Sequence, residues 1–134
     1  MATSNLRSVF LLACLFFLGC QKTLLPPAPT TGPGTVSIEL ESGDGRATFE
    51  VMDVAAGPTL ESLMRSIYQV HVSIQGSGLT AFVDGIDGQS TSGSEGWTFE
   101  VDGEFANEGI GSITLTPPTT ITWSYGDASE ILAE

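Results

Sequence analysis

Aromatic residues in the second half of the chain are the side chains best suited to form a ligand site. The candidates are Trp97, Phe99, Phe105, Trp123 and Tyr125. Trp97 and Phe99 alternate with polar residues, as do Trp123 and Tyr125, which is the pattern of strands with one buried face. If the two strands pair, these rings could form one cluster. The cluster could fill the core, or it could stack an apolar ligand or a partner protein at the edge of a sheet.

Residues for catalysis are few. His71 is the single histidine of the sequence, and no nucleophile is evident beside it. We therefore predict no catalytic residue and no enzymatic activity, with a hydrolase at His71 as the least favoured alternative. Asp84, Asp87 and Ser90 offer the oxygen ligands that calcium prefers. Carboxylates at a turn are more often solvated turn formers, so we predict no metal site.

The charge of the chain restricts its partners. There are 16 acidic and 4 basic residues, which gives a net charge of -12. This charge argues against binding to nucleic acid, which needs clustered Lys and Arg, and against docking on anionic lipid. A cationic partner is compatible with it, as is a plainly solvated surface.

Residues 1–20 have the pattern of a secretory signal. Arg7 supplies the positive charge, and Val9 to Leu18 form an apolar run. The run is shorter than the ~20 residues needed to span a bilayer. Its end, Phe17-Leu18-Gly19-Cys20, resembles a bacterial lipobox, although the first two residues depart from the usual Leu followed by Ala or Ser.

The resemblance to a lipobox implies a lipid anchor on Cys20. Cys14 is an alternative with too short an apolar run before it, and a plainly cleaved signal or an uncleaved anchor also remains open. Gln21 is not the Asp that usually retains lipoproteins in the inner membrane, so the resemblance implies the outer membrane. Residues 21–34 are rich in Pro and Thr and predict an extended tether.

The elements that position the aromatic residues are predicted from residues 35–127. Thr35 to Glu41 and Arg46 to Val54 alternate as a hairpin, and Thr59 caps a helix that ends near Tyr68. Further strands follow, including Leu79 to Ile86 and a strand from Trp97 that is closed by a turn at Asp102-Gly103. Gly88 to Gly96 and Phe105 to Gly111 are irregular, and residues 128–134 form a short acidic tail. This order predicts an α+β fold with one short helix on one face of the sheet.

Four segments resemble the transcobalamin-like C-terminal domain family, which is also catalogued in bacteria as a domain of unknown function. They are the helix entry Gly57-Pro58-Thr59-Leu60-Glu61-Ser62-Leu63, the turn Phe82-Val83-Asp84-Gly85-Ile86-Asp87-Gly88, the strand Gly96-Trp97-Thr98-Phe99-Glu100-Val101-Asp102-Gly103-Glu104, and the final strand Ile121-Thr122-Trp123-Ser124-Tyr125. The resemblance covers about Val36 to Asp127. Two departures are Asp102, where Asn is commoner, and Pro117-Pro118, which replaces a Gly-Asp turn.

The resemblance implies a β-grasp-like, mostly antiparallel sheet with one short helix. In the vertebrate cobalamin carriers this domain covers one face of cobalamin, and a helical barrel, for which this chain has no room, holds the other. We therefore predict no cofactor, while a corrinoid-like ligand stays possible. The predicted function is a membrane-anchored extracytoplasmic lipoprotein with a non-enzymatic binding module for such a small molecule or for a partner protein. The alternative is a structural or adhesive display domain without a ligand pocket.

Overall fold

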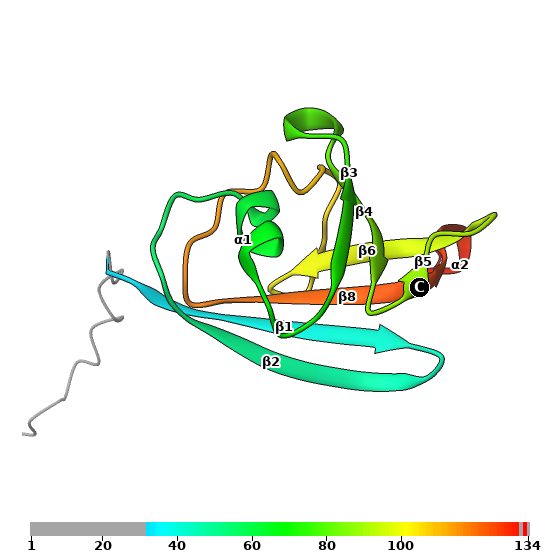
Figure 1. Cartoon of the computed structure of the whole chain (residues 1–134), viewed down its shortest axis with the longest axis horizontal. Coiled ribbons are helices and arrows are strands. Elements are labelled where there is room, and N and C mark those ends of the chain that lie inside the picture. Colours follow the sequence, from blue (N-terminus) through cyan, green and yellow to red (C-terminus); the bar gives the residue numbers. More distant parts are fainter. Residues whose placement is uncertain (1–31, 132, 134) are drawn as a thin grey trace, which may run out of the picture.

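The protein folds into two β-sheets with short helices, a small α+β architecture (Figure 1). The computed structural model describes residues 32–131 and 133. The predicted signal peptide with Cys14 and Cys20, and most of the predicted tether, lie outside the described residues. Among the described residues, 32–131 and 133, no helix is both long enough and apolar enough to cross a membrane.

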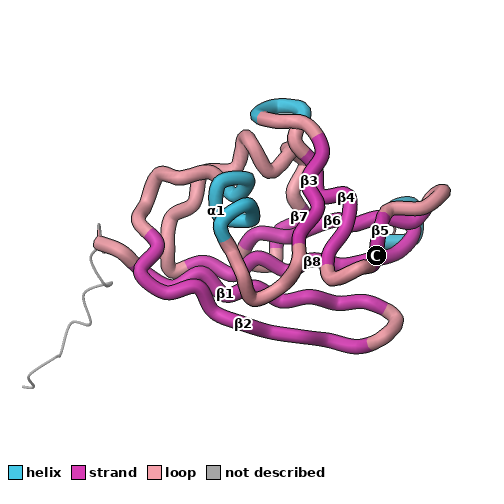
Figure 2. The backbone as a smooth tube through the Cα atoms, in the orientation of Figure 1, coloured by secondary structure: helices cyan, strands magenta, loops and turns pink. Residues whose placement is uncertain are grey.

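The larger sheet has five strands and includes both the first and the last strand of the domain. They are β1 (Gly34–Ser42), β2 (Gly45–Val54), β6 (Glu95–Val101), β7 (Glu104–Phe105) and β8 (Thr119–Asp127). Their order is β2-β1-β8-β6-β7 (Figure 2). β1 and β8 run parallel, and the other neighbours are antiparallel. The sheet is therefore mixed, although most of its pairs are antiparallel as predicted.

A second, three-stranded sheet was not distinguished in the sequence. It consists of β3 (Val72–Gln75), β4 (Phe82–Ile86) and β5 (Gln89–Ser90), in the order β3-β4-β5. The strand predicted from Leu79 onward begins later, because Gly78–Thr80 forms a 3-10 turn, η1. The Thr80 hydroxyl donates to the Ser77 carbonyl at 3.0 Å and closes this turn.

One face of the larger sheet supplies much of the core. Side chains alternate between the two faces of each strand, so the apolar residues of β1 and β8 lie side by side on this face, with Ile38 beside Ile121 and Leu40 beside Trp123. Helix α1 (Leu60–Ser66) buries Leu60, Leu63 and Met64, as its predicted apolar face requires. The helix ends before Tyr68, whose side chain is exposed.

The start of α1 is capped as predicted, and it is also hydrogen-bonded to the loop between β7 and β8, which was predicted only as irregular. The Thr59 hydroxyl accepts from the Ser62 amide at 3.2 Å. The amides of Leu60 and Glu61 donate to the carbonyls of Ile113 and Ile110, both at 2.9 Å. These bonds satisfy helix N–H groups that have no partner within the helix, so the 106–118 connection is tied to α1.

The two departures from the family pattern meet at the start of β8, where Asp102 binds the residues that follow Pro117-Pro118. Asp102 and Gly103 have φ angles of 51° and 82°, and their positive values fit a type I′ hairpin turn between β6 and β7. The Asp102 carboxylate accepts from the Thr120 amide at 2.8 Å and from the Thr119 hydroxyl at 2.9 Å. Asp102 thus holds the start of β8, directly after Pro117-Pro118.

The predicted acidic tail begins with a short helix, α2 (Ala128–Ile131). The Ser129 amide and hydroxyl donate to the Asp127 carboxylate at 2.8 and 2.5 Å. Hydrogen bonds from the Ser129 side chain, the Ser129 amide and Ser94 hold the pKa of the Asp127 carboxyl below its usual value.

Candidate functional site

Four of the five predicted aromatic residues come together on one face of the larger sheet. The antiparallel pairing of β6 and β8 places Trp97 opposite Tyr125 and Phe99 opposite Trp123. The ring centroids lie 5.2 Å apart in the first pair and 4.8 Å apart in the second. The predicted cluster is therefore present, and its two pairs have different surroundings.

The inner pair, Phe99 and Trp123, belongs to the hydrophobic core. Phe99 is 9% exposed and Trp123 only 1% exposed. The indole N–H of Trp123 is buried and has no hydrogen-bond partner among the described residues. Neither ring offers a surface to a ligand, so this pair is scaffold.

Phe105, the fifth candidate, lies apart from the cluster. The two-residue turn at Asp102 and Gly103 sets Phe105 opposite Glu100. Glu100 alternates with Phe99 along β6, so its side chain and that of Phe105 lie on the opposite face of the sheet. Phe105 is 42% exposed there and is not in contact with the aromatic cluster.

The outer pair, Trp97 and Tyr125, joins the two sheets. The Trp97 indole N–H donates to the Gln89 carbonyl at 2.8 Å, and the Tyr125 hydroxyl donates to the Ser90 carbonyl at 2.8 Å. Both acceptors lie on β5, within the stretch predicted as an irregular loop. Both rings are only half-buried, so they fasten β5 and still reach the surface.

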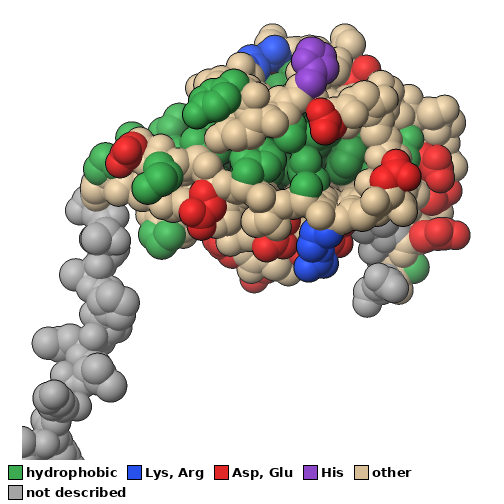
Figure 3. Space-filling view, turned by 60° about the horizontal axis from the view of Figure 1, so that its bottom comes forward, with side chains coloured by type: hydrophobic (Ala, Val, Ile, Leu, Met, Phe, Trp, Pro, Cys, Tyr) green, Lys and Arg blue, Asp and Glu red, His purple; other side chains and the backbone are tan. Residues whose placement is uncertain are grey.

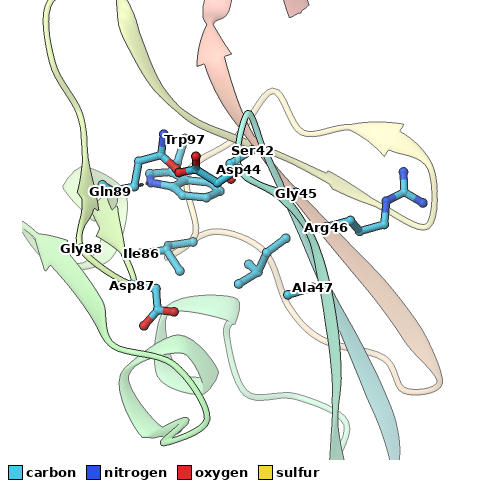
Figure 4. Close-up of a pocket in the computed structure, with 11 residues that line it drawn as sticks. Ser42, Asp44, Gly45, Arg46, Ala47, Ile86, Asp87, Gly88, Gln89 and Trp97 are labelled. Carbon is cyan, nitrogen blue, oxygen red and sulfur yellow. Dashed lines mark hydrogen bonds between the residues drawn. The ribbon is translucent and has the colours of Figure 1, made fainter.

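A pocket of about 560 Å³ opens beside Trp97, between the tip of the β1–β2 hairpin and the β4–β5 turn (Figure 4). The apolar side chains that line it are Leu40, Ala47, Ile86 and Trp97. The polar residues that line it include Ser42, Asp44, Arg46, Asp87 and Gln89. The volume lies within the range of about 300 to 1,000 Å³ that is typical of small-molecule sites.

Both walls of the pocket are hairpin tips with defined geometry. Asp87 and Gly88 have φ angles of 54° and 88°, as a type I′ turn requires. Apart from Trp97, and Asp87 as a possible calcium ligand, the lining residues were missed in the sequence, where Asp44 and Gln89 belong to segments read only as turn or loop. The Asp-Gly turn was the one local signal, and it predicts a hairpin without indicating what the hairpin faces.

The charged groups of the pocket are mostly acidic. The Arg46 guanidinium pairs with Glu41 and extends away from the cavity, whereas Asp44 lies on the Trp97 side (Figure 4). The space-filling view shows hydrophobic side chains gathered in the middle of one face, with acidic side chains around them (Figure 3). The site therefore combines four apolar side chains with a polar lining that carries two carboxylates.

Of the other residues considered for chemistry, His71 and Asp84 lie outside this arrangement, whereas Asp87 lines the pocket and the Ser90 carbonyl accepts from Tyr125. His71 is exposed and lines a separate pocket of about 540 Å³ near the end of α1, together with Arg65 and Tyr68. Asp84 accepts a hydrogen bond from the Thr91 amide through its main-chain carbonyl at 2.7 Å. Across residues 32–131 and 133, no group of three or more His, Cys, Asp or Glu side chains is placed to hold a metal ion.

Comparisons with known proteins add a family and a fold. A family model described as "Domain of unknown function (DUF4430)" matches residues 57–127. A candidate metal-binding protein from Ruminococcus gnavus superposes with a TM-score of 0.58 at 16% identity, over 71% of this chain and 98% of that one. Haptocorrin in complex with Cbi superposes with a TM-score of 0.57 at 14% identity, over 72% of this chain and 26% of that one. No match was found among the curated proteins.

Proposed function

The chain belongs to the DUF4430 family, and on that premise we propose that it is a non-enzymatic binding module for a small ligand. The observation that carries this proposal is the pocket beside Trp97. An aromatic ring at its wall, an apolar interior and a few polar groups at its rim are the features of small-molecule sites. The ring is held in place by its bond to Gln89, so the pocket is formed before a ligand arrives.

The same pocket weighs against the display-domain alternative. A display domain without a ligand site is expected to bury both tryptophans and to have no aromatic-lined cleft. Trp123 is buried, but Trp97 is half-buried and lines a cavity. A partner protein inserting a side chain there is the second version of the binding proposal.

A corrinoid-like molecule is the first ligand to test. Haptocorrin, whose structure is a complex with Cbi, shares the fold over 26% of its own length. The first hairpin, the helix that follows it and the parallel pairing of β1 with β8 support a β-grasp-like assignment of the domain. A flat macrocycle is larger than the pocket, so we propose that only one edge of it is seated against Trp97.

Corrinoid titration tests this proposal. We expect saturable binding in equilibrium dialysis followed by corrinoid absorbance. Replacing Trp97 with Ala should weaken binding about tenfold, which corresponds to a loss of about 1.4 kcal/mol of ring contact. Phe105→Ala removes an aromatic ring from the opposite face and should leave the affinity unchanged. Absence of binding at high micromolar corrinoid would exclude this ligand class.

We further propose that the module is a lipoprotein of the bacterial cell envelope, anchored in the outer membrane through Cys20 and facing the periplasm or the cell surface. The tether enters the domain at Gly34, at the start of β1, whereas the pocket lies at the other end of that strand. An anchor at the N-terminal end would therefore present the pocket away from the lipid.

Replacing Cys20 with Ser should move the protein from the membrane fraction to the soluble fraction, because the lipid acceptor is lost. The matched control is Cys14→Ser, which should stay with the membrane. Fractionation followed by immunoblotting measures both. If the Cys20 variant remains in the membrane and the Cys14 variant leaves it, the anchor has been assigned to the wrong cysteine.

A further inference from the structure

The charge distribution around the pocket indicates the kind of ligand that it takes. We propose that the pocket selects small organic cations with a flat apolar body. This inference rests on the proposed binding function and deepens it. It follows from three observations: the aromatic wall, the acidic rim and the position of the nearby arginine.

The aromatic wall favours a cation with an apolar body. Trp97 lines the pocket together with Leu40, Ala47 and Ile86, so a ligand group that enters leaves water on several sides. A cation over a tryptophan face is stabilised by about 0.5 to 2 kcal/mol, more when it is desolvated. Strongly hydrated ions gain less, because the apolar lining cannot replace their water.

The rim supplies the opposite charge. Asp44 and Asp87 both line the pocket, from two different hairpin tips, with Asp44 on the Trp97 side and Asp87 on the far side of Ile86 (Figure 4). A ligand with a negative charge would meet these carboxylates and would be rejected, because Arg46, the one basic residue of the lining, is already paired with Glu41. These two carboxylates would therefore select ligands by their charge at the mouth of the pocket.

The arginine beside the pocket does not cancel this charge. Arg46 is paired with Glu41, and its guanidinium extends away from the cavity (Figure 4). The other arginine of the described part, Arg65, pairs with Glu61 at 2.9 Å and donates to the Gly76 carbonyl at 2.8 Å. The net charge of -12 adds a general attraction for cations.

A bare metal ion fits this site less well than an organic cation. Only two carboxylates reach the rim, and among residues 32–131 and 133 no cluster of three or more metal-ligating side chains exists. Calcium prefers six to eight oxygen ligands. The apolar interior would also remain unfilled.

Three probes with the same phenyl ring isolate the effect of charge. Benzyltrimethylammonium is positive, benzyl alcohol is neutral and phenylacetate is negative. Binding is followed by NMR at the indole N–H resonance of Trp97. We expect the cation to bind about tenfold more tightly than the alcohol and the anion to bind more weakly than either. The preference should shrink as salt is added, because exposed charges are screened.

Variants then test the carboxylates directly. Asp44→Asn combined with Asp87→Asn should bring the affinity for the cation down to that for benzyl alcohol and leave the alcohol unchanged. Asn keeps the shape of Asp and tolerates the positive φ of Asp87. The matched control is Glu104→Gln on β7. Glu104 does not line the pocket, so this substitution should alter neither affinity.

The outcomes separate this inference from the proposed function. Equal affinities for cation and alcohol, an unchanged preference in the double variant, or no binding of any probe would each overturn the cation proposal. Corrinoid binding with no charge preference would leave the binding module in place without its cation selectivity. Cation binding without corrinoid binding would support the selectivity and remove only the corrinoid.

Discussion

Replacing Gly111 with Ala is expected to lower the stability of the domain by about 3 kcal/mol, the upper end of what overpacking costs. A Cβ at this position would lie 2.8 Å from the Cα of Gly78 and still closer to the Gly78 carbonyl oxygen. That oxygen already accepts a hydrogen bond from the Ala81 amide at 3.1 Å. The obstacle is backbone, so no side-chain rotation can relieve the clash, and the 106–118 connection must separate from η1.

Urea denaturation followed by tryptophan fluorescence measures this loss. The matched control is Gly43→Ala in the β1–β2 turn, where an added Cβ meets no atom within 4 Å and the φ angle is not positive. Its stability should stay within about 0.5 kcal/mol of the parent, as is usual for surface substitutions. Similar unfolding midpoints for the two variants would show that the connection can move away from η1 at little cost.

The second large effect is expected at Trp123. Replacing it with Ala should destabilise the domain by about 4 kcal/mol, since a large buried ring is deleted and leaves a cavity against Phe99 and Leu40. Trp97→Ala should cost less, about 1 to 2 kcal/mol, since that ring is half-buried and loses mainly its bond to the Gln89 carbonyl.

Circular dichroism measures both variants, because each removes a fluorophore. The two tryptophans should also separate by function. Trp97→Ala is expected to fold and lose ligand affinity, whereas Trp123→Phe, which keeps an aromatic ring in the core, should retain it. Loss of binding in Trp123→Phe with a folded domain would place the ligand elsewhere in the cluster.

Local sequence signals predicted the elements whose partners are close in the chain. The first hairpin, the Thr59 cap and the turn at Asp102 and Gly103 each follow from residues within a few positions of one another. The parallel pairing of β1 with β8 joins strands about 80 residues apart, as in Glu39 and Thr122, and no local pattern indicates it. The division of the strands into two sheets was likewise not indicated by any local pattern, because it depends on which strands meet when the chain folds.

The candidate site was predictable only in part. Alternation correctly placed Trp97 and Tyr125 on one face, and their pairing followed from the antiparallel contact of β6 and β8. The position of Phe105 on the opposite face could not be predicted from its aromatic character, because the two-residue turn before it sets which face of the sheet its side chain occupies. Asp44 became a site residue only when folding brought two hairpin tips together.

The parallel β1–β8 pair has a mechanical consequence for a tethered protein. Under the proposed anchoring, tension would enter the domain at Gly34 on β1, and a ligand held against Trp97 would load β6, which is joined to β1 through β8. Such a force runs along β1 and is shared by all its rungs with β8, from Val36 to Glu41, because they are sheared together and not unzipped one at a time. The β1–β8 pairing would therefore resist a force that pulls the proposed ligand away from the proposed anchor.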